Sequence, residues 1–378
     1  MSNRLALLGL FIGILAACCS CGGGRGADAQ NEGDTLRLKY AERLVIVKHE
    51  GYTEVTLKNP WKEGKVLHRY FLVPYDATTP LPSEHGATVV RTPLRRVAVF
   101  TTVHASLIMT FGREQSIAGV ADVKYMKIPF IHEGVKEGRI VDCGDGLNPM
   151  AEKIIDAQAD AIMLSPFENS GGYGRLEEID IPLIECAEYM ETSPLGRAEW
   201  MRFYGLLFGE EQRADSLFAA VDSSYQALAK TARQAKSSPK VLMDKQVGSV
   251  WYMPGGRSTI GQMLQDAGAN YPYASDEHSG SIPLPFEAVL EKAGDSDVWL
   301  FRYDNEQPMT LPQLLSEQHG YSQLRPVQTG QTYGCNVRTT QFYEQSPFRP
   351  DLLLQDFIHI LHPELPDQPE LRYYKKVE

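Results

Sequence analysis

The stretch that decides the fold is free of proline and reads GRAEWMRFYGLLFG at residues 196–209 and EQRADSLFAAVDSSYQALAKTARQAK at residues 211–236. Apolar residues recur along it at helical spacing, from Trp200 and Phe203 to Tyr225 and Leu228. One helix of roughly 35–40 residues would extend more than about 50 Å, which is too long to pack inside a single α/β lobe. The stretch therefore predicts a rigid strut that joins two lobes. The alternative is a pair of core helices with a bend near Gly209.

Short apolar strands alternate with helical stretches on both sides of this strut. Strands are predicted before it at 97–100, 117–120, 140–141, 161–164 and 183–184, and after it at 241–243 and 298–301. Such alternation indicates a mostly parallel sheet that is covered on both faces. The predicted fold class is α/β, with two Rossmann-like lobes at 91–195 and 238–365 joined by a long rigid helix at 196–237. Residues 366–378 are expected to form a tail.

A β-rich extension precedes the first lobe, at residues 35–90. Apolar and polar residues alternate between positions 36 and 76, and Gly51, Pro60 and Gly64 separate the runs. This pattern predicts three or four antiparallel strands. The extension either docks a partner or covers an edge of the first lobe.

The first 17 residues are typical of a lipoprotein signal peptide. Arg4 precedes an almost wholly apolar run that ends at Leu15 and is too short to span a bilayer. The residues Leu15-Ala16-Ala17-Cys18 resemble a bacterial lipobox, in which the chain is cut before Cys18 and its thiol carries the lipid. An ordinary cleaved signal and a buried apolar helix are the alternatives. We expect residues 18–34 to form a flexible tether and the protein to be lipid-anchored to a membrane, in the periplasm or at the cell surface.

Composition and motifs exclude several function classes. A net charge of −11 argues against a nucleic-acid binder, whose surface would be basic. The nine histidines are scattered without an HExxH or HxH pattern, so no bare metal site is expected. Neither a Walker lysine nor a GxSxG context is present, so nothing specifies a phosphate cradle or a hydrolase. Buried free thiols are expected at Cys143, Cys186 and Cys335.

Several motifs, in their order along the chain, resemble those of the substrate-binding proteins of ABC importers for metal chelates: iron–siderophore complexes, haem and vitamin B12. The likeness covers roughly residues 92–364, about three quarters of the chain. It rests on the segments Arg95–His104, Ile117–Asp122, Asn148–Ile162, Trp251–Gly256, Gly280–Leu290, Arg349–Asp356 and Ile360–Leu365. Each motif is weak alone, but their order together with the long helix and the lipobox supports the family.

The resemblance implies a binding protein and not an enzyme. Two rigid lobes would face each other across a cleft that closes only slightly, with no resident cofactor. The loaded protein would dock on an ABC permease, which works with its ATPase, through one acidic residue in each lobe. The matching residues are Glu152 and Glu287, both at the start of a helix, where the helix dipole favours a carboxylate. Simple helix capping is the alternative for both.

Cleft residues are expected in loops at the carboxyl ends of the strands, where open α/β sheets bind ligands. Aromatic side chains suit a large flat chelate, and arginines suit its carboxylates, which favours an iron siderophore or haem over cobalamin. The candidates are Thr101, Thr102, His104, Tyr125, Phe167 and Glu168 in the first lobe, and Trp251, Tyr252, Arg257, Arg302 and Tyr303 in the second.

Alternatives remain open for parts of this site. Packing inside the lobe is the other interpretation of Trp251 and Tyr252, and a surface ion pair that of Arg302. A late loop is expected to fold back over the cleft with Asn336, Arg338, Gln341, Phe342 and Tyr343. A haem would find axial-ligand candidates in His104, Tyr125 and His278. A lipoprotein enzyme of the same two-lobed architecture and a surface interaction module are the rival function classes.

Overall fold

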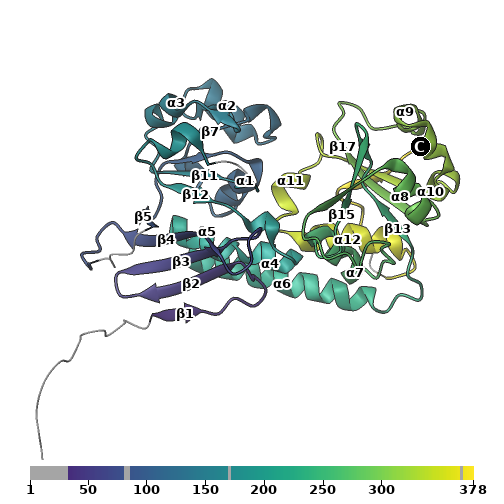
Figure 1. The fold of residues 1–378 in the computed structure, drawn as a ribbon, viewed down its shortest axis with the longest axis horizontal. Helices are drawn as coiled ribbons and strands as arrows, with labels where there is room; N and C mark the ends of the chain where they lie inside the picture. The colour runs from purple at the N-terminus through teal and green to yellow at the C-terminus, as the bar shows by residue number, and fades with distance from the viewer. Residues whose placement is uncertain (1–32, 81–85, 169–171, 367–368) are drawn as a thin grey trace, which may run out of the picture. The chain divides into compact units, whose positions relative to one another are not determined.

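Two separate sheets of mainly parallel strands form the centres of the two lobes (Figure 1). The computed structural model describes residues 33–80, 86–168, 172–366 and 369–378. The predicted signal peptide, Cys18 and nearly all of the predicted tether lie outside the described residues. No helix in the described ranges is both long and apolar enough to span a membrane.

The first lobe contains five parallel strands in the order β12-β11-β6-β7-β8. Their bounds are β6 (Val97–Val99), β7 (Ile117–Val120), β8 (Val141–Asp142), β11 (Ala161–Leu164) and β12 (Leu183–Glu185). These strands are short and largely apolar because both faces of the sheet are buried. β6 lies in the middle, and the chain adds β7 and β8 on one side and β11 and β12 on the other. The reversal between β6 and β11 is the point where open α/β sheets bind ligands.

Short helices connect these strands. They are α1 (Thr102–Thr110), α2 (Pro129–Lys136) and α3 (Ala151–Asp156), with single 3₁₀ turns η1 (Glu114–Ser116), η2 (Val123–Tyr125), η3 (Gly174–Glu177) and η4 (Glu188–Met190). A small hairpin of β9 (Gly144–Asp145) and β10 (Asn148–Pro149) precedes α3. Thr101 caps α1, since its hydroxyl oxygen accepts a hydrogen bond from the His104 backbone N–H.

The second lobe has a parallel sheet and a smaller antiparallel sheet. The order of the first is β13-β17-β18-β19, with β13 (Val241–Met243), β17 (Val298–Tyr303) and β18 (Thr332–Asn336) parallel, and β19 (Tyr374–Lys376) antiparallel. The second consists of β14 (Gln246–Val247), β15 (Val250–Pro254) and β16 (Ser281–Leu284). The remaining elements are α7 (Thr259–Asp266), α8 (Phe286–Ala293), α9 (Leu311–Glu317), η5 (His319–Gln323), α10 (Arg325–Gln328), α11 (Phe342–Gln345) and α12 (Pro350–Leu361).

The predicted tail is built into the second lobe. β19 pairs with β18, and Tyr373 and Tyr374 are buried. The buried carboxylate of Asp356 on α12 accepts hydrogen bonds from the backbone N–H groups of Arg372 (2.8 Å), Tyr373 (2.7 Å) and Tyr374 (3.1 Å). These residues therefore complete the sheet, and their polar character had hidden the strand in the sequence.

The connecting stretch is three helices instead of one: α4 (Pro194–Glu199), α5 (Met201–Phe208) and α6 (Glu211–Ala232). Gly209 ends α5 in the left-handed conformation, with φ of 66°. A Cβ on Gly205 would lie 2.6 Å from the Cβ of Ala214, so this glycine lets α5 pack closely on α6. The chain bends at Gly209, as the alternative predicted, but it forms three helices and not a pair.

Although the stretch is divided into three helices, α6 by itself still runs from the first lobe to the second (Figure 1). Phe218, in its first half, packs edge-on against Tyr40, which precedes the first lobe. In its second half the Tyr225 hydroxyl donates a 2.8 Å hydrogen bond to Asp266 at the end of α7. α12 also packs along it. A helix of 22 residues is about 33 Å long, which is enough for this role.

The N-terminal sheet contains β1 (Asp34–Leu36), β2 (Leu44–His49), β3 (Tyr52–Lys58), β4 (Val66–Pro74) and β5 (Ala87–Thr92). The first four are antiparallel, within the predicted number, and β5 adds a parallel partner to β4. Its buried face, with Ile46, Val55 and Tyr70, belongs to the same core as Phe203 of α5. The Tyr70 hydroxyl donates to the carbonyl of Leu183 (3.1 Å) on the edge strand β12. Of the two alternatives for the extension, the structure shows the covered edge.

Two buried carboxylates hold the segment between β1 and β2. Glu199 accepts hydrogen bonds from the backbone N–H groups of Lys39 (2.9 Å), Tyr40 (2.7 Å) and Ala41 (3.0 Å). Glu191 accepts two more, from the backbone N–H groups of residues 42 and 43, each at 3.0 Å. Both carboxylates are fully buried, so these bonds tie the segment to α4 and the loop before it.

Candidate functional site

A cavity of about 520 Å³ opens in the first lobe where β6 and β11 end. Phe100 and Thr101 follow β6, and Ser165 and Phe167 follow β11. Residues 146–149 and 172–176 form the opposite walls. The position matches the topological reversal of the sheet, and the volume lies within the range of about 300–1,000 Å³ that small-molecule sites occupy.

The walls of this cleft cavity are mostly apolar and carry few polar groups. Two of the apolar side chains, Leu147 and Phe167, are 83% and 49% exposed, so apolar surface faces solvent at the mouth. Among the lining residues that the structure describes, Asp122 and Arg175 are the charged ones. Exposed apolar surface with a small number of polar groups is the pattern of a site for an amphipathic organic ligand.

Arg175 lines the cleft cavity and also forms an ion pair with a predicted docking residue, Glu152. Its guanidinium Nη2 lies 2.8 Å from Oε1 of Glu152, in the first turn of α3. A hydrogen bond from the Glu152 backbone and the nearby Arg175 lower the pKa of the Glu152 carboxyl. Both side chains are more than half exposed, and such pairs contribute little to stability. An anion in the cavity can therefore compete with Glu152 for this guanidinium.

Tyr173, in the same wall, is held by a chain of hydrogen bonds. Its hydroxyl donates to Oε1 of Glu185 over 2.6 Å, and Oε2 of Glu185 lies 3.0 Å from Nδ1 of His68. Burial and then the Glu185 carboxylate raise the pKa of Tyr173, so the phenol stays protonated. These hydrogen bonds connect the wall of the cleft cavity to the N-terminal sheet.

Two predicted first-lobe residues, Thr101 and Phe167, line the cleft cavity. Glu168 and Tyr125 are exposed but are not part of its lining. The Thr102 hydroxyl instead donates a 2.8 Å hydrogen bond to Oε1 of Glu344 in α11, so it bridges the two lobes.

The prediction of a cleft role for His104 is wrong, because its side chain points into the core. The residue is 1% exposed, with Nε2 3.3 Å from Oε1 of Glu188. Tyr204 donates to the other oxygen of Glu188, over 3.0 Å. Burial alone would lower the pKa of His104, but nearby Cys186 and Glu188 outweigh it and raise this pKa to about 10. The imidazole thus belongs to a buried ion pair and is not available to a haem iron.

None of the predicted second-lobe residues lines the cleft cavity. Trp251 is fully buried among Phe286, Trp299 and Tyr321, and its indole N–H donates to the Met243 carbonyl (2.9 Å), so it packs inside the lobe. Tyr252 is 47% exposed, and Arg257 is exposed as well.

Arg302 forms an ion pair, as its alternative predicted. Nε and Nη2 contact the two oxygens of Asp244 at 2.9 and 2.7 Å, beside a separate cavity of about 150 Å³. Tyr303 lines another cavity, of about 440 Å³, and accepts a hydrogen bond from the backbone N–H of Met309. The exposed His278 pairs with Asp276 over 2.9 Å and is not near the cleft cavity lining.

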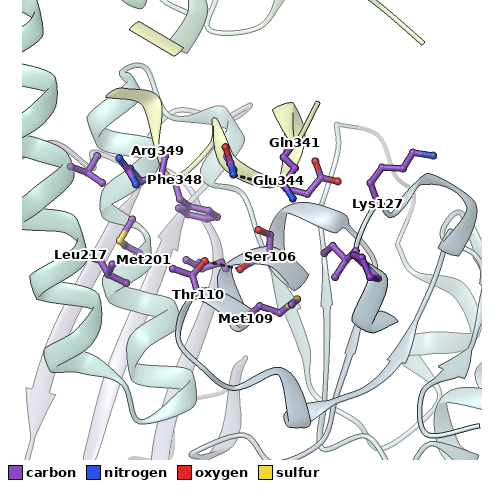
Figure 2. A pocket seen from close by; sticks show the side chains of 15 residues that line it. Ser106, Met109, Thr110, Lys127, Met201, Leu217, Gln341, Glu344, Phe348 and Arg349 are labelled. Carbon is purple, nitrogen blue, oxygen red and sulfur yellow. Dashed lines mark hydrogen bonds between the residues drawn. The ribbon is translucent and has the colours of Figure 1, made fainter. Parts of the chain in front are cut away.

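The late loop does reach the first lobe, through α11. The five residues named for this loop do not form one site. Asn336 donates a hydrogen bond to the backbone of Asn305, and Arg338 pairs with Asp304. Phe342 is buried, and Gln341 and Tyr343 line two different cavities. α11 packs against α1, and between them and α6 lies a junction cavity of about 340 Å³. Figure 2 shows Ser106 and Thr110 of α1 facing Phe348 and Glu344, with Leu217 of α6 at the side.

The two predicted docking residues are both on the surface. Glu287 lies in the first turn of α8 and is exposed, like Glu152 on α3. Exposed Leu147, Met150 and Ile155 surround the Glu152 helix. Glu152 and Glu287 therefore give each lobe an exposed carboxylate in the first turn of a helix.

In the described ranges, no group of three or more histidine, cysteine, aspartate or glutamate side chains converges in a way that could hold a metal ion. Cys143, Cys186 and Cys335 are free and buried, as predicted.

Sequence reasoning missed several residues of the cleft cavity, notably Leu147, Asn148, Tyr173 and Arg175. Gly172 and Gly174 flank Tyr173 in the sequence, and without a Walker lysine this glycine-rich stretch did not point to a phosphate site. An aromatic residue in a glycine-rich loop after a buried strand was the signal that would have found it.

These features define a two-lobed solute-binding protein with its cavity at the reversal of a parallel sheet. The sequence pattern of the periplasmic binding protein family matches residues 97–339, and the chain belongs to that family. The α/β fold class predicted from the sequence is thereby confirmed.

Relatives and solved structures agree with this assignment. An uncharacterized lipoprotein of Methanocaldococcus jannaschii is 24% identical over 356 residues, which cover 87% of this chain and 83% of that protein. A periplasmic heme binding protein from Pseudomonas aeruginosa superposes with a TM-score of 0.58 and 14% identity over 75% of this chain and 98% of its own. An ABC-type Fe³⁺-hydroxamate transport protein from Saccharomonospora viridis gives a TM-score of 0.54 and 20% identity over 71% and 92%.

Proposed function

We propose that this protein captures an iron chelate, a siderophore complex or haem, in the cleft cavity and delivers it to an ABC permease. The observation that carries the proposal is the cleft cavity of about 520 Å³, with exposed apolar walls and the guanidinium of Arg175. Apolar walls suit the organic body of a chelate, and the guanidinium suits its carboxylates. The structural neighbours that bind heme and transport Fe³⁺-hydroxamate support this ligand class.

Ligand titration tests the proposal. The full chain, purified in detergent, is titrated with haemin, a ferric hydroxamate, ferric citrate and cyanocobalamin, followed by absorbance and tryptophan fluorescence. We expect submicromolar binding of one iron chelate. Phe167→Ala, which removes an aromatic wall, should weaken it about tenfold, since burying such a side chain contributes roughly 1.5–3 kcal/mol.

Tyr125→Ala is the matched control, because Tyr125 is 63% exposed in the same lobe but lies outside the cavity lining. Binding of cyanocobalamin alone would favour the alternative, a cobalamin-binding protein of the same importer family. Absence of binding across the panel would contradict the proposal.

We further propose that Glu152 and Glu287 dock the loaded protein on the permease, and that a lipid on Cys18 keeps it at the membrane. Their exposure at helix starts in opposite lobes supports the docking role, since exposed carboxylates there can pair with permease arginines, which at Glu152 would replace Arg175. Glu152→Gln and Glu287→Gln should both abolish uptake by cells. Glu287→Gln should leave haemin or siderophore affinity unchanged, and Glu152→Gln, which releases the Arg175 guanidinium, should not lower it. Glu133→Gln, on the exposed face of α2, is the control. Normal uptake by both docking variants would refute this assignment.

A further inference from the structure

The N-terminal sheet lies outside the matched family segment, yet it reaches the wall of the cleft cavity. β4 places His68 and Tyr70 two residues apart on one face, with their rings stacked at 4.4 Å. Both contact β12, the edge strand of the first-lobe sheet: Tyr70 through the carbonyl of Leu183 and the N–H of Glu185, and His68 through the Glu185 carboxylate. β12 therefore contacts the N-terminal sheet directly and is joined to the cavity wall by the hydrogen bond from Tyr173 to Glu185.

The Glu185 carboxylate is the centre of this connection. The residue is 6% exposed, so its charge needs hydrogen-bond donors from the protein. One donor is the Tyr173 hydroxyl at 2.6 Å, and the other is Nδ1 of His68 at 3.0 Å. His68 is itself fixed, because its Nε2 lies 2.7 Å from the hydroxyl of Thr88 on β5. Strands β4 and β5 of the N-terminal sheet, through His68 and Thr88, thus fix the carboxylate that β12 carries, together with Tyr173.

This arrangement determines what Tyr173 offers to the cavity. The hydroxyl proton is committed to Glu185, so the phenol oxygen can only accept hydrogen bonds from a ligand. The ring cannot turn without breaking a short bond to a buried charge, and that loss is larger than for a neutral partner. A wall residue held in this way is organised before the ligand arrives, which lowers the entropy that binding must overcome.

We propose that His68 is a positioning residue of the ligand site: the N-terminal sheet, through His68 and Glu185, fixes Tyr173 in the wall of the cleft cavity. The extension is thus part of the binding lobe and not a separate docking module. The inference rests on the proposed function, because it takes this cavity as the ligand site.

The test compares two matched substitutions in the full chain. His68→Phe keeps a ring stacked on Tyr70 but removes both ring nitrogens. His49→Phe makes the same change elsewhere in the sheet, where His49 stacks on Tyr52 at 4.6 Å and lies near Glu54. The chain carries tyrosine labelled with ¹³C at Cζ, and the Tyr173 signal is assigned from its absence in Tyr173→Phe.

We expect His68→Phe to shift the Tyr173 signal and to weaken binding of the best iron chelate of the panel about fivefold. The effect is smaller than for a direct contact, because the lost hydrogen bond positions Tyr173 and does not itself touch the ligand. His49→Phe should change neither. His68→Asn, whose amide nitrogen can occupy the position of Nδ1, should restore both the signal and the affinity. Circular dichroism checks that each variant is folded, and His68→Leu, which also removes both ring nitrogens, carries the comparison if the Phe variant is not.

The experiment distinguishes failure of the positioning role from failure of the proposed function. An unchanged Tyr173 signal and unchanged affinity in His68→Phe would overturn the positioning role even if Tyr173→Phe binds weakly. If the wild-type protein binds none of the chelates, the proposed function fails, and the ligand-free Tyr173 signal still decides whether His68 positions this ring.

Discussion

Replacing Glu199 by alanine should detach the segment that leads into the N-terminal sheet. The carboxylate is fully buried and accepts backbone hydrogen bonds of 2.7–3.0 Å from residues 39, 40 and 41. Glu199→Ala removes the acceptor for all three at once. Glu199→Gln keeps the shape of the side chain but turns one acceptor oxygen into a donor.

The magnitude follows from these contacts. A hydrogen bond to a charged group contributes about 1.5–3 kcal/mol when it is well buried. Residues 39–41 are partly exposed, so water replaces part of each bond, and about 1 kcal/mol per bond is a reasonable value. Glu199→Ala should then lower the free energy of unfolding by about 3 kcal/mol and Glu199→Gln by about 1–2 kcal/mol. Such a loss is a large fraction of the roughly 5–15 kcal/mol typical of a folded protein.

Urea unfolding followed by tryptophan fluorescence measures this difference, because Trp200 lies next to Glu199 in the chain. Amide hydrogen exchange provides the local readout: the N–H groups of Lys39, Tyr40 and Ala41 should be protected in the wild type and exchange rapidly in Glu199→Ala. Glu133→Ala, on exposed α2, is the control and should change stability by no more than about 0.5 kcal/mol. A loss below about 1 kcal/mol in Glu199→Ala, with protection retained, would refute the reasoning.

Three further predictions concern charge. Arg175→Ala should weaken binding of an anionic iron chelate about tenfold and leave cyanocobalamin unaffected, as isothermal titration can show; equal effects on both would contradict its role as an anion contact. The protonated form of His104 should stabilise the fold fully below about pH 6.5, and this stabilisation should be lost as the pH rises toward about 10. The melting temperature of the wild type should therefore fall over this pH range, and that of His104→Gln should fall less. Asp356→Ala should lower the free energy of unfolding by about 3 kcal/mol, since it leaves three backbone N–H groups of residues 372–374 without their acceptor; an unchanged urea midpoint would count against that role.

The architecture was predictable because hydrophobic periodicity reports local structure directly. The alternation of apolar strands with helices identified both lobes, and the alternation between residues 36 and 76 identified the antiparallel strands. The length of the connecting helix was not predictable in this way. The left-handed Gly209 and the close contact at Gly205 depend on packing between α5 and α6, which periodicity does not report.

The site was predictable only in part, because side-chain direction depends on tertiary packing. Thr101 and Phe167 line the cavity, since they directly follow parallel strands. Trp251 instead lies within β15 and His104 within α1, and both side chains point into the core. An aromatic cluster surrounds Trp251, and the Glu188 carboxylate pairs with His104. Arg175 and its pairing with Glu152 depend on a loop fold that no sequence pattern encodes.

The backbone bonds to Glu191 and Glu199 have a consequence for the folding kinetics of this protein. Residues 39 and 199 are separated by 160 positions, so the strands that leave the ribosome early wait for carboxylates that are made much later. Closing a loop of that size costs entropy before any contact compensates for it, which slows such pairings. The apolar face of β2 and β3 stays uncovered in the meantime, and strands in that state aggregate. We therefore expect the N-terminal sheet to complete its packing only after the loop at Glu191 and helix α4 have formed.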